Sequence, residues 1–279
     1  MRTDLAKEAK KAVPNLKGVS ESSETIDGLE CVRIAVQTQE AARRLDKPIG
    51  TYVSITMPKE TLYDRASAEA CAHVAAGELV SLLPKDGTIL VIVLGNRYIT
   101  ADALGTKTAE HILVTRHLFR TFSDLLPEGT RTVCSFCTGV LGVTGIETVE
   151  IVSAVTNRLR PDGVLIVDSL AAGAPEHLGT VLQMNDTGIS PGAGIGNFRA
   201  SLNRETLGVP VAAIGIPLVV GAEALLGDDD PNASEALSGL FVTPKDIDLL
   251  VRNAAKMLAL AINTAIHAKN APILQNLLQ

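Results

Sequence analysis

Hydrophobic residues recur in two patterns along this chain, and together the patterns predict alternating strands and helices. Continuous apolar runs bounded by polar residues or glycine are typical of strands buried on both faces. They cover residues 29–36, 50–57, 88–95, 131–136, 163–170 and 209–217. Ala, Leu and Val at helical spacing predict helices at residues 62–83, 103–122, 146–159 and 243–267. This alternation predicts an α/β fold, with a mostly parallel central sheet covered by helices on both faces.

Two stretches of the chain show neither the strand pattern nor the helix pattern of hydrophobic residues. The polar residues 1–27 are interpreted as an N-terminal leader that precedes a single domain at 28–279. Residues 221–239 have the composition of a loop, with three consecutive aspartates followed by proline.

Composition narrows the class of protein. The 279 residues are 46% hydrophobic but only 3% aromatic, so the core is built from aliphatic side chains. The net charge is −6, and acidic and basic residues are mixed along the chain. We therefore expect no direct binding to nucleic acid, which requires a basic surface. No apolar run reaches the roughly 20 residues that span a bilayer, and the charged N-terminus lacks the apolar core of a signal peptide. We therefore expect no membrane partner and a cytoplasmic location.

Asp102 and Asp168 are the candidate catalytic residues. Asp102 follows the apolar run at 88–95, and Asp168 follows the run at 163–167. Ligands of open parallel sheets bind where the carboxyl ends of strands meet, so the two acids are expected to face one cleft. A close pair of carboxylates binds protons unequally, which suits hydrolysis of an amide. The alternative interpretation is that each aspartate caps a helix N-terminus.

A glycine-rich stretch at 185–199 is a second candidate site. Its backbone amides can bind an anion, but its spacing fits neither a P-loop nor a dinucleotide-binding loop. The favoured role is a backbone wall that a peptide main chain approaches closely.

Cys134 and Cys137 form a Cys-x-x-Cys motif that no second pair completes. The histidines are scattered, so we expect reduced structural thiols, no metal site and no cofactor, with metal dependence left open.

Several segments, spread nearly from end to end, resemble the germination protease family of spore-forming bacteria. They are RTDLAKEAK at 2–10, LGN at 94–96, TADALG at 100–105, HILVTRHLF at 111–119, GVLGVTGIET at 139–148, VDSLAAGA at 167–174, DTGISPGAGIGN at 186–197, ETLGVPVAAIGIP at 205–217 and VTPKDID at 242–248.

The resemblance implies an aspartic-type endopeptidase of the cytoplasm of the spore core. Such an enzyme degrades the small acid-soluble spore proteins during germination. The family's two essential aspartates map onto Asp102 and Asp168. The resemblance also implies a fold similar to that of hydrogenase-maturation endopeptidases, a zymogen that trims its own N-terminus, and a homo-oligomer, specifically a tetramer. Residues 1–27 then become a candidate short pro-segment, and 28–279 a peptidase domain.

Substrates of the resembled family are cut after an acidic residue and before a hydrophobic residue followed by Ala. Asp4-Leu5 is therefore the candidate self-cleavage bond, with a flexible terminus as the alternative. The candidate substrate-binding residues are Asn96, Arg97, Gly192, Gly194 and Arg199.

The chain departs from the resembled family near 221–240, where family members carry a long insertion and this chain has only about twenty residues. Two other functions stay open. One is a metal-assisted maturation-type endopeptidase. The other is a non-catalytic α/β protein that binds a peptide or anion.

Overall fold

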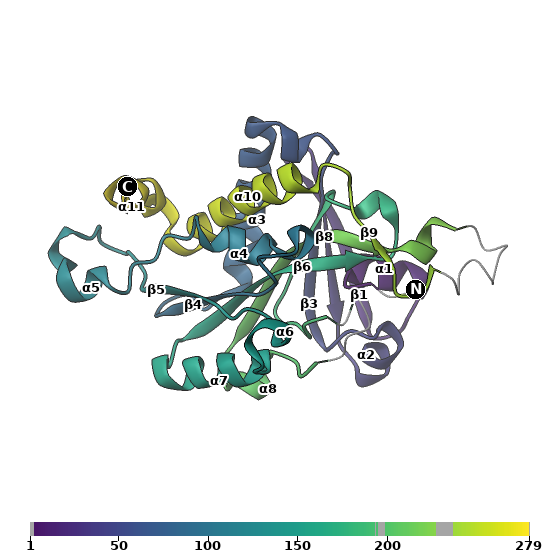
Figure 1. Cartoon of the computed structure of the whole chain (residues 1–279), viewed down its shortest axis with the longest axis horizontal. Coiled ribbons are helices and arrows are strands. Elements are labelled where there is room, and N and C mark those ends of the chain that lie inside the picture. The colour runs from purple at the N-terminus through teal and green to yellow at the C-terminus, as the bar shows by residue number, and fades with distance from the viewer. Residues whose placement is uncertain (1–2, 193, 195–198, 227–236, 279) are drawn as a thin grey trace.

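A mixed β-sheet runs through the protein (Figure 1). The computed structural model describes residues 3–192, 194, 199–226 and 237–278. Within these residues the sheet has nine strands, in the order β1-β2-β3-β7-β8-β6-β4-β5, and β9 pairs with β8. The strands are β1 (Val19–Ile26), β2 (Leu29–Val36), β3 (Gly50–Thr56), β4 (Ile89–Val93), β5 (Val133–Cys137), β6 (Gly163–Ala172), β7 (Val181–Asn185), β8 (Val211–Gly221) and β9 (Phe241–Val242).

Helices cover both faces of this sheet, which confirms the predicted α/β class (Figure 1). The α-helices are α1 (Ala6–Ala12), α2 (Gln39–Leu45), α3 (Arg65–Leu82), α4 (Leu104–Ala109), α5 (Leu118–Thr121), α6 (Leu141–Thr144), α7 (Thr148–Leu159), α8 (Arg204–Leu207), α10 (Ile247–His267) and α11 (Ala271–Leu278). Short 3-10 helices include η1 (Thr61–Tyr63), η2 (Thr100–Asp102) and η4 (Pro175–His177).

The sheet is parallel in only one of its halves. Strands β8, β6, β4 and β5 pair in parallel, as the alternating pattern predicts. Strands β1, β2, β3 and β7 pair antiparallel, and β7 also joins β8 antiparallel. The pattern missed β7, and this strand reverses the chain direction in the middle of the sheet.

The interval before Leu29 is folded, although its hydrophobic pattern predicts no element there. It contains α1 and β1, and β1 pairs antiparallel with β2 from Ile26↔Leu29 outward. Asp27 and Gly28 between them have φ of 48° and 81°, the left-handed values that a two-residue hairpin turn requires. An Asp-Gly pair is a strong hairpin signal, and here it outweighs the polar composition of β1.

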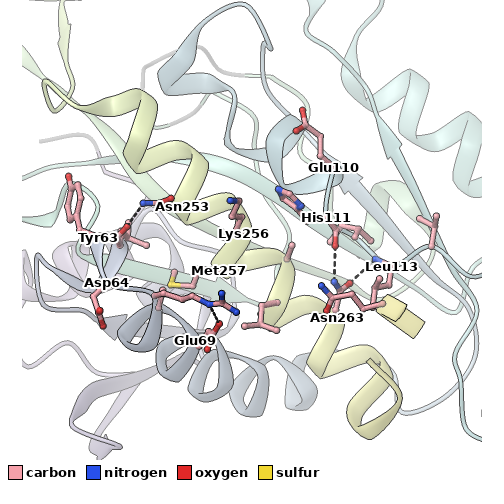
Figure 2. A pocket seen from close by; sticks show the side chains of 18 of the residues that line it. Tyr63, Asp64, Glu69, Glu110, His111, Leu113, Asn253, Lys256, Met257 and Asn263 are labelled. Atoms are coloured by element: carbon pink, nitrogen blue, oxygen red, sulfur yellow. Dashed lines mark hydrogen bonds and ion pairs between the residues drawn. The ribbon is translucent and has the colours of Figure 1, made fainter. Parts of the chain in front are cut away.

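The single helix predicted at 103–122 is wrong. Helix α4 ends at Ala109, and the chain then runs without helix to α5. Asn263 of α10 accepts a hydrogen bond from the Leu113 N–H at 2.9 Å and donates one to the His111 carbonyl at 2.9 Å (Figure 2). These tertiary bonds satisfy backbone groups that a helix would have paired internally.

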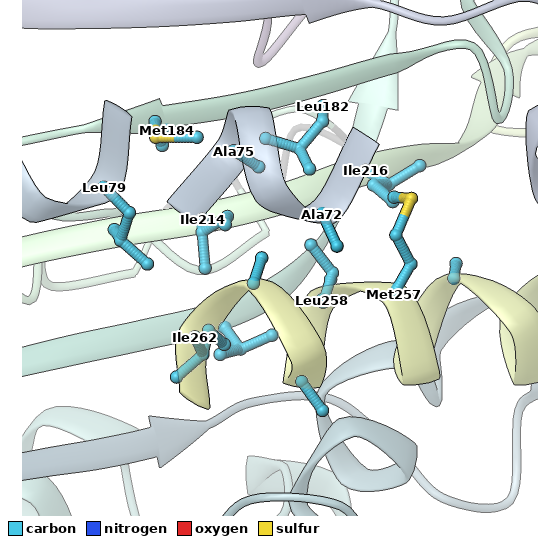
Figure 3. Packing of buried hydrophobic residues seen from close by; sticks show 14 of the residues in the cluster. Ala72, Ala75, Leu79, Leu182, Met184, Ile214, Ile216, Met257, Leu258 and Ile262 are labelled. Atoms are coloured by element: carbon cyan, nitrogen blue, oxygen red, sulfur yellow. The ribbon is translucent and has the colours of Figure 1, made fainter. Parts of the chain in front are cut away.

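Helices α3 and α10 pack together on one face of the sheet (Figure 3). Leu258 and Ile262 of α10 lie beside Ala75 and Leu79 of α3, over aliphatic side chains of β7 and β8. Residues 247–276 form the one described stretch that is long and apolar enough to cross a membrane, and its most apolar window has a mean hydropathy of 1.3. In its most apolar window, 61% of the residues are buried, as in a core helix.

Removing one side chain from α10 tests this packing. Leu258 is fully buried, so Leu258→Ala is expected to lower the free energy of unfolding by about 2–5 kcal/mol. Leu249 lies on the same helix with 41% of its surface exposed, and Leu249→Ala is expected to change stability by about 0.5 kcal/mol or less. Denaturant unfolding of both variants measures the difference. Equal losses would contradict the assignment of the buried face.

Candidate active site

Asp168 lies inside β6 at the point where the neighbouring strand β4 stops. The parallel pairing of β4 with β6 ends at Val93↔Val167. Strand β6 continues to Ala172 because it stays paired with β8. Asp168 therefore lies within the strand, whereas the sequence predicted that it follows the end of the strand. It is one residue beyond the last pairing with β4, and it is only 8% exposed.

Asp102 is brought to this edge of the sheet by the loop that follows β4. Its carboxylate accepts a hydrogen bond from the Asn96 N–H at 2.8 Å, which closes the loop back on itself. Gly95 has a φ of 106°, and a Cβ there would overlap the Asp102 carbonyl. A Cβ at Gly105 would overlap the Leu94 carbonyl, so glycine lets α4 begin directly against the strand ends.

Neither aspartate caps an α-helix. Helix α4 begins after Ala103, and no side chain caps it. Asp102 belongs to η2, and its carboxylate is bonded to the Asn96 N–H. Asp168 accepts from the Ser169 N–H at 2.8 Å within a strand. The helix-cap interpretation is therefore wrong for both residues.

Burial and like charge favour a proton on Asp168. Burial, together with the charges of Asp102 and Asp4, raises the pKa of Asp168 well above its ordinary value. Burial also raises the pKa of Asp102, and the Asn96 N–H partly offsets this by stabilising the carboxylate. These directions describe acids close enough to influence one another, with the proton retained preferentially by the more deeply buried Asp168.

The N-terminal segment supplies the third carboxylate, because residues 4–8 dock onto the end of β6. The Asp4 N–H donates to the Ala171 carbonyl at 2.9 Å, and the Ala171 N–H donates to the Asp4 carboxylate at 2.8 Å. Leu5 is fully buried against Leu170, Ala172 and Val181. The flexible-terminus interpretation of Asp4-Leu5 is thus wrong in this structure.

Gln183 of β7 holds the main chain on both sides of Leu5. Its side-chain amide donates to the Asp4 carbonyl at 2.7 Å and accepts from the Ala6 N–H at 2.6 Å. Side chains alternate between the two faces of a strand, so Asp168 and Leu170 share one face of β6. Because Leu5 packs on Leu170, the docked segment lies on the same face as Asp168.

Glu8 anchors the segment one helical turn later. Its buried carboxylate accepts from the N–H groups of Gly173 and Ala174, at 2.7 and 3.0 Å. The His177 Nδ1 lies 2.5 Å from the same carboxylate. Lys47 donates to the Thr3 carbonyl at 2.9 Å. Residues 3–8 are therefore held by backbone, polar and apolar contacts together.

Of the five predicted substrate-binding residues, two contact carboxylates of the site and the other three have different surroundings. Asn96 contacts Asp102, and Gly194 contacts the Asp4 carboxylate through its backbone N–H. Arg199 pairs with Glu147 at 3.2 Å instead. Arg97 is exposed; burial raises the pKa of Cys137, and the charge of Arg97 offsets part of that rise. Gly192 occupies a turn with a φ of 75°.

Cys134 and Cys137 do not form half of a zinc site. They are three residues apart on β5, so their side chains point to opposite faces, and both are free thiols. Within the described ranges, no three His, Cys, Asp or Glu side chains are grouped to hold a metal ion.

A cavity of about 1000 Å³ lies elsewhere, between η1, the start of α3, α10 and residues 110–114 (Figure 2). Tyr63, His111 and Lys256 are among its lining residues, and neither Asp102 nor Asp168 is. It belongs to the α3–α10 side of the sheet, whereas alternation along β6 directs Asp168 to the opposite face.

Sequence reasoning missed Lys47, Gln183, Glu8 and His177. Gln183 had a usable signal, because it interrupts the apolar residues of 181–184, and buried polar side chains require partners. Lys47 had none. It directly follows α2, and only the tertiary fold brings it to Thr3.

Comparison with known proteins agrees with the resemblance noted in the sequence. The family model described as germination protease matches residues 1–230. A germination protease of Clostridium perfringens is 35% identical over 308 residues, covering 95% of each chain. That of Bacillus subtilis is 33% identical over 346 residues, covering 96% of this chain and 94% of its own. A solved structure, the NiFe hydrogenase maturation protease HycI of Thermococcus kodakarensis, matches 71% of this chain and 99% of its own, with 21% identity and a TM-score of 0.41.

These sequence matches define the protein as a protease built on an α/β fold. Within that class, the chain belongs to the germination protease family. The alignment with the Bacillus subtilis relative spans 346 positions, more than the 279 residues of this chain, so that relative contains segments which this chain lacks.

The raised pKa of Asp168 predicts a pH-dependent gain in stability for Asp168→Asn. A carboxyl whose pKa is raised by folding costs stability once the pH rises above its unfolded value, and this cost grows until the folded pKa is passed. Asn removes the charge and keeps an acceptor for the Ser169 N–H. We expect a Tm gain of at least about 3 °C near pH 7, corresponding to about 1 kcal/mol, and no gain near pH 4 or below.

Thermal unfolding across this pH range measures the effect, with Asp86→Asn as the control at an exposed aspartate. A gain that does not depend on pH would show that packing, and not ionisation, separates the two proteins.

Proposed function

We propose that this protease cleaves peptide bonds after acidic residues by using Asp102 and Asp168 as an acid-base pair. The observation that carries the proposal is the meeting of three carboxylates at the end of β6. The charges of Asp102 and Asp4 both raise the pKa of the buried Asp168. One of the three belongs to the candidate self-cleavage bond, so a substrate-like acid lies beside the two candidate catalytic acids.

The proposed roles follow from the burial of the two acids. Asp168 keeps its proton and donates it to the nitrogen of the departing amine. Asp102 is the less buried of the two, and as a carboxylate it takes a proton from the attacking water. Gln183 donates to the Asp4 carbonyl, which is where negative charge would develop as water attacks that bond.

The proposed substrates are the small acid-soluble spore proteins, and the proposed place of action is the cytoplasm of the germinating spore. Support comes from the family and from the docked segment, which presents an acid, a hydrophobic residue and Ala in order, as Asp4-Leu5-Ala6. Leu5 is buried in one apolar cluster, and Ala6 is 2% exposed in another. Self-processing at Asp4-Leu5 and assembly as a homo-oligomer belong to the same proposal.

Loss of either aspartate is expected to stop cleavage without unfolding the protein. Asp102→Asn and Asp168→Asn should each lower kcat/KM on a small acid-soluble spore protein by about 10²–10⁴-fold, the usual contribution of a general acid or base. Asp86→Asn is the matched control and should retain activity. Mass spectrometry of the digests also identifies the bonds that are cut.

The same assay separates the alternative functions. Activity that disappears after exhaustive chelation and returns with added metal would favour the metal-assisted mechanism. A wild-type protein that cuts nothing at any pH would favour a binding protein. Full activity in either Asn variant would rule out the acid-base pair.

Self-cleavage is expected to produce a new N-terminus at Leu5. Intact-mass measurement of purified protein over time should show loss of the residues up to Asp4 in wild type and no loss in Asp168→Asn. Dilution should leave the rate unchanged, because the bond is docked in the same molecule. A rate that scales with protein concentration would place the cut bond in another copy of the chain.

A further inference from the structure

The Asp4 side chain occupies a pocket formed by three separate parts of the chain. Its carboxylate accepts a hydrogen bond from the Ala171 N–H at 2.8 Å and another from the Gly194 N–H. Lys47 donates to the adjacent Thr3 carbonyl at 2.9 Å, which places its ammonium close to Asp4. These three groups, the two N–H groups and the Lys47 ammonium, are called the acid pocket below.

The acid pocket is matched to a carboxylate in shape and in hydrogen-bonding type. All three groups are donors, whereas a side-chain amide of the same size would turn its own NH₂ toward one of them. A Cβ at Gly194 would overlap the Asp4 carboxylate, so only glycine allows this close approach. Charge-assisted hydrogen bonds of this kind are stronger than neutral ones.

Lys47 supplies the positive charge of the acid pocket, and the fold holds its backbone in place. Helix α2 ends in a left-handed Asp46, and the N–H of Lys47 donates back to the Ala42 carbonyl at 3.1 Å. Burial lowers the pKa of Lys47, and the charges of Asp4, Asp46 and Glu8 oppose that change. Burial raises the pKa of Asp4, and the Ala171 N–H, the positive charge of Lys47 and the Gly194 N–H oppose that change. The two charges therefore stabilise each other in a half-buried site.

We propose that the acid pocket is the subsite that recognises the acidic residue before the cleaved bond, with Lys47 as the specificity-determining residue. The inference rests on the proposed function, because it treats Asp4 as a substrate acid in place. Arg199, one of the candidate substrate-binding residues, pairs with Glu147 instead.

The first test compares two peptides that differ only in Glu or Gln before the cut bond. Wild-type protein is expected to prefer the Glu peptide by at least about tenfold in kcat/KM. In Lys47→Met this preference should fall about tenfold. Cleavage of both peptides is expected to slow, because Lys47 also donates to the main-chain carbonyl before the acid, but cleavage of the Glu peptide should slow by about ten times more than that of the Gln peptide.

Two further variants are controls for this comparison. Lys47→Arg keeps the charge and should keep most of the preference, and Lys59→Met removes an exposed lysine elsewhere and should keep all of it. An undiminished Glu preference in Lys47→Met would overturn the proposal.

The second test needs no catalysis and is made in the Asp168→Asn background. Hydrogen exchange at the amides of residues 5–9 reports undocking of the N-terminal segment. Asp4→Asn and Lys47→Met should each speed exchange several-fold, and the double variant should be no faster than the faster single one. If the double variant instead exchanges at a rate raised by the product of the two single effects, Lys47 and Asp4 act independently. That result would overturn the proposal.

The two tests distinguish failure of the acid pocket from failure of the proposed function. If wild type cuts neither peptide, the proposed function fails and the exchange experiment alone decides the acid pocket. If both peptides are cut equally well by wild type and by Lys47→Met, the protease stands and the acid pocket does not.

Discussion

The pairing of β6 with β8 is the interaction on which the rest of the site depends. Strand β4 leaves β6 at Val167, and without β8 the chain would be free to turn there, as the apolar pattern alone suggests. Because β8 pairs with β6 as far as Ala172↔Val220, the backbone stays extended through Asp168 and beyond. This extended backbone buries Asp168. It also leaves the N–H and carbonyl of Ala171 available for hydrogen bonds with Asp4. One strand therefore provides both a candidate catalytic acid and the docking edge for the N-terminal segment.

Docking of that segment offsets part of the cost of burying charge. A carboxylate taken out of water loses stability unless hydrogen bonds or opposite charge replace the solvent. Asp4 receives two backbone N–H groups and the field of Lys47, and Glu8 receives two N–H groups and His177. Asp168 receives only the Ser169 N–H and lies beside two other acids. The least compensated carboxylate is thus the one assigned the proton.

The sequence predicted the parts of the fold that depend on local hydrophobic pattern, and it failed where tertiary contacts decide. The runs at 88–95 and 163–170 became β4 and β6, and the closing helix became α10. The segment after Ala109 has helical spacing, but Asn263 takes its backbone hydrogen bonds, and Asn263 lies 150 residues away from Leu113. The hydrophobic pattern missed β1 because this strand is polar. The sequence signal for it is the Asp27-Gly28 turn that follows it.

For the candidate site, too, the sequence predicted the residues that lie near apolar runs and missed those that tertiary contacts bring together. Asp102 and Asp168 stand next to apolar runs, so strand-end reasoning reached them, and the resemblance gave them a role. Gly194 was reached through the glycine-rich composition of its segment. Lys47 follows α2 and Gln183 lies on β7, both far from residues 3–6 in sequence, and only the mixed sheet brings them to that segment. No spacing rule connects positions that meet where an antiparallel half of a sheet joins a parallel half.

Cleavage at Asp4-Leu5 would change the electrostatics of the site that performs it. Leu5 is held by its apolar cluster, and α1 begins immediately after it. The new N-terminus at Leu5 is therefore expected to stay bound. Asp4 would keep only its polar contacts and lose its covalent tie to that anchor. Its departure removes one of the two charges that raise the pKa of Asp168 and leaves the acid pocket open to an acidic side chain of a substrate. A substrate acid entering the same pocket restores the lost charge and, with it, the tendency of Asp168 to hold a proton. In this scheme the acid to be recognised also helps to set the protonation state that cleavage requires.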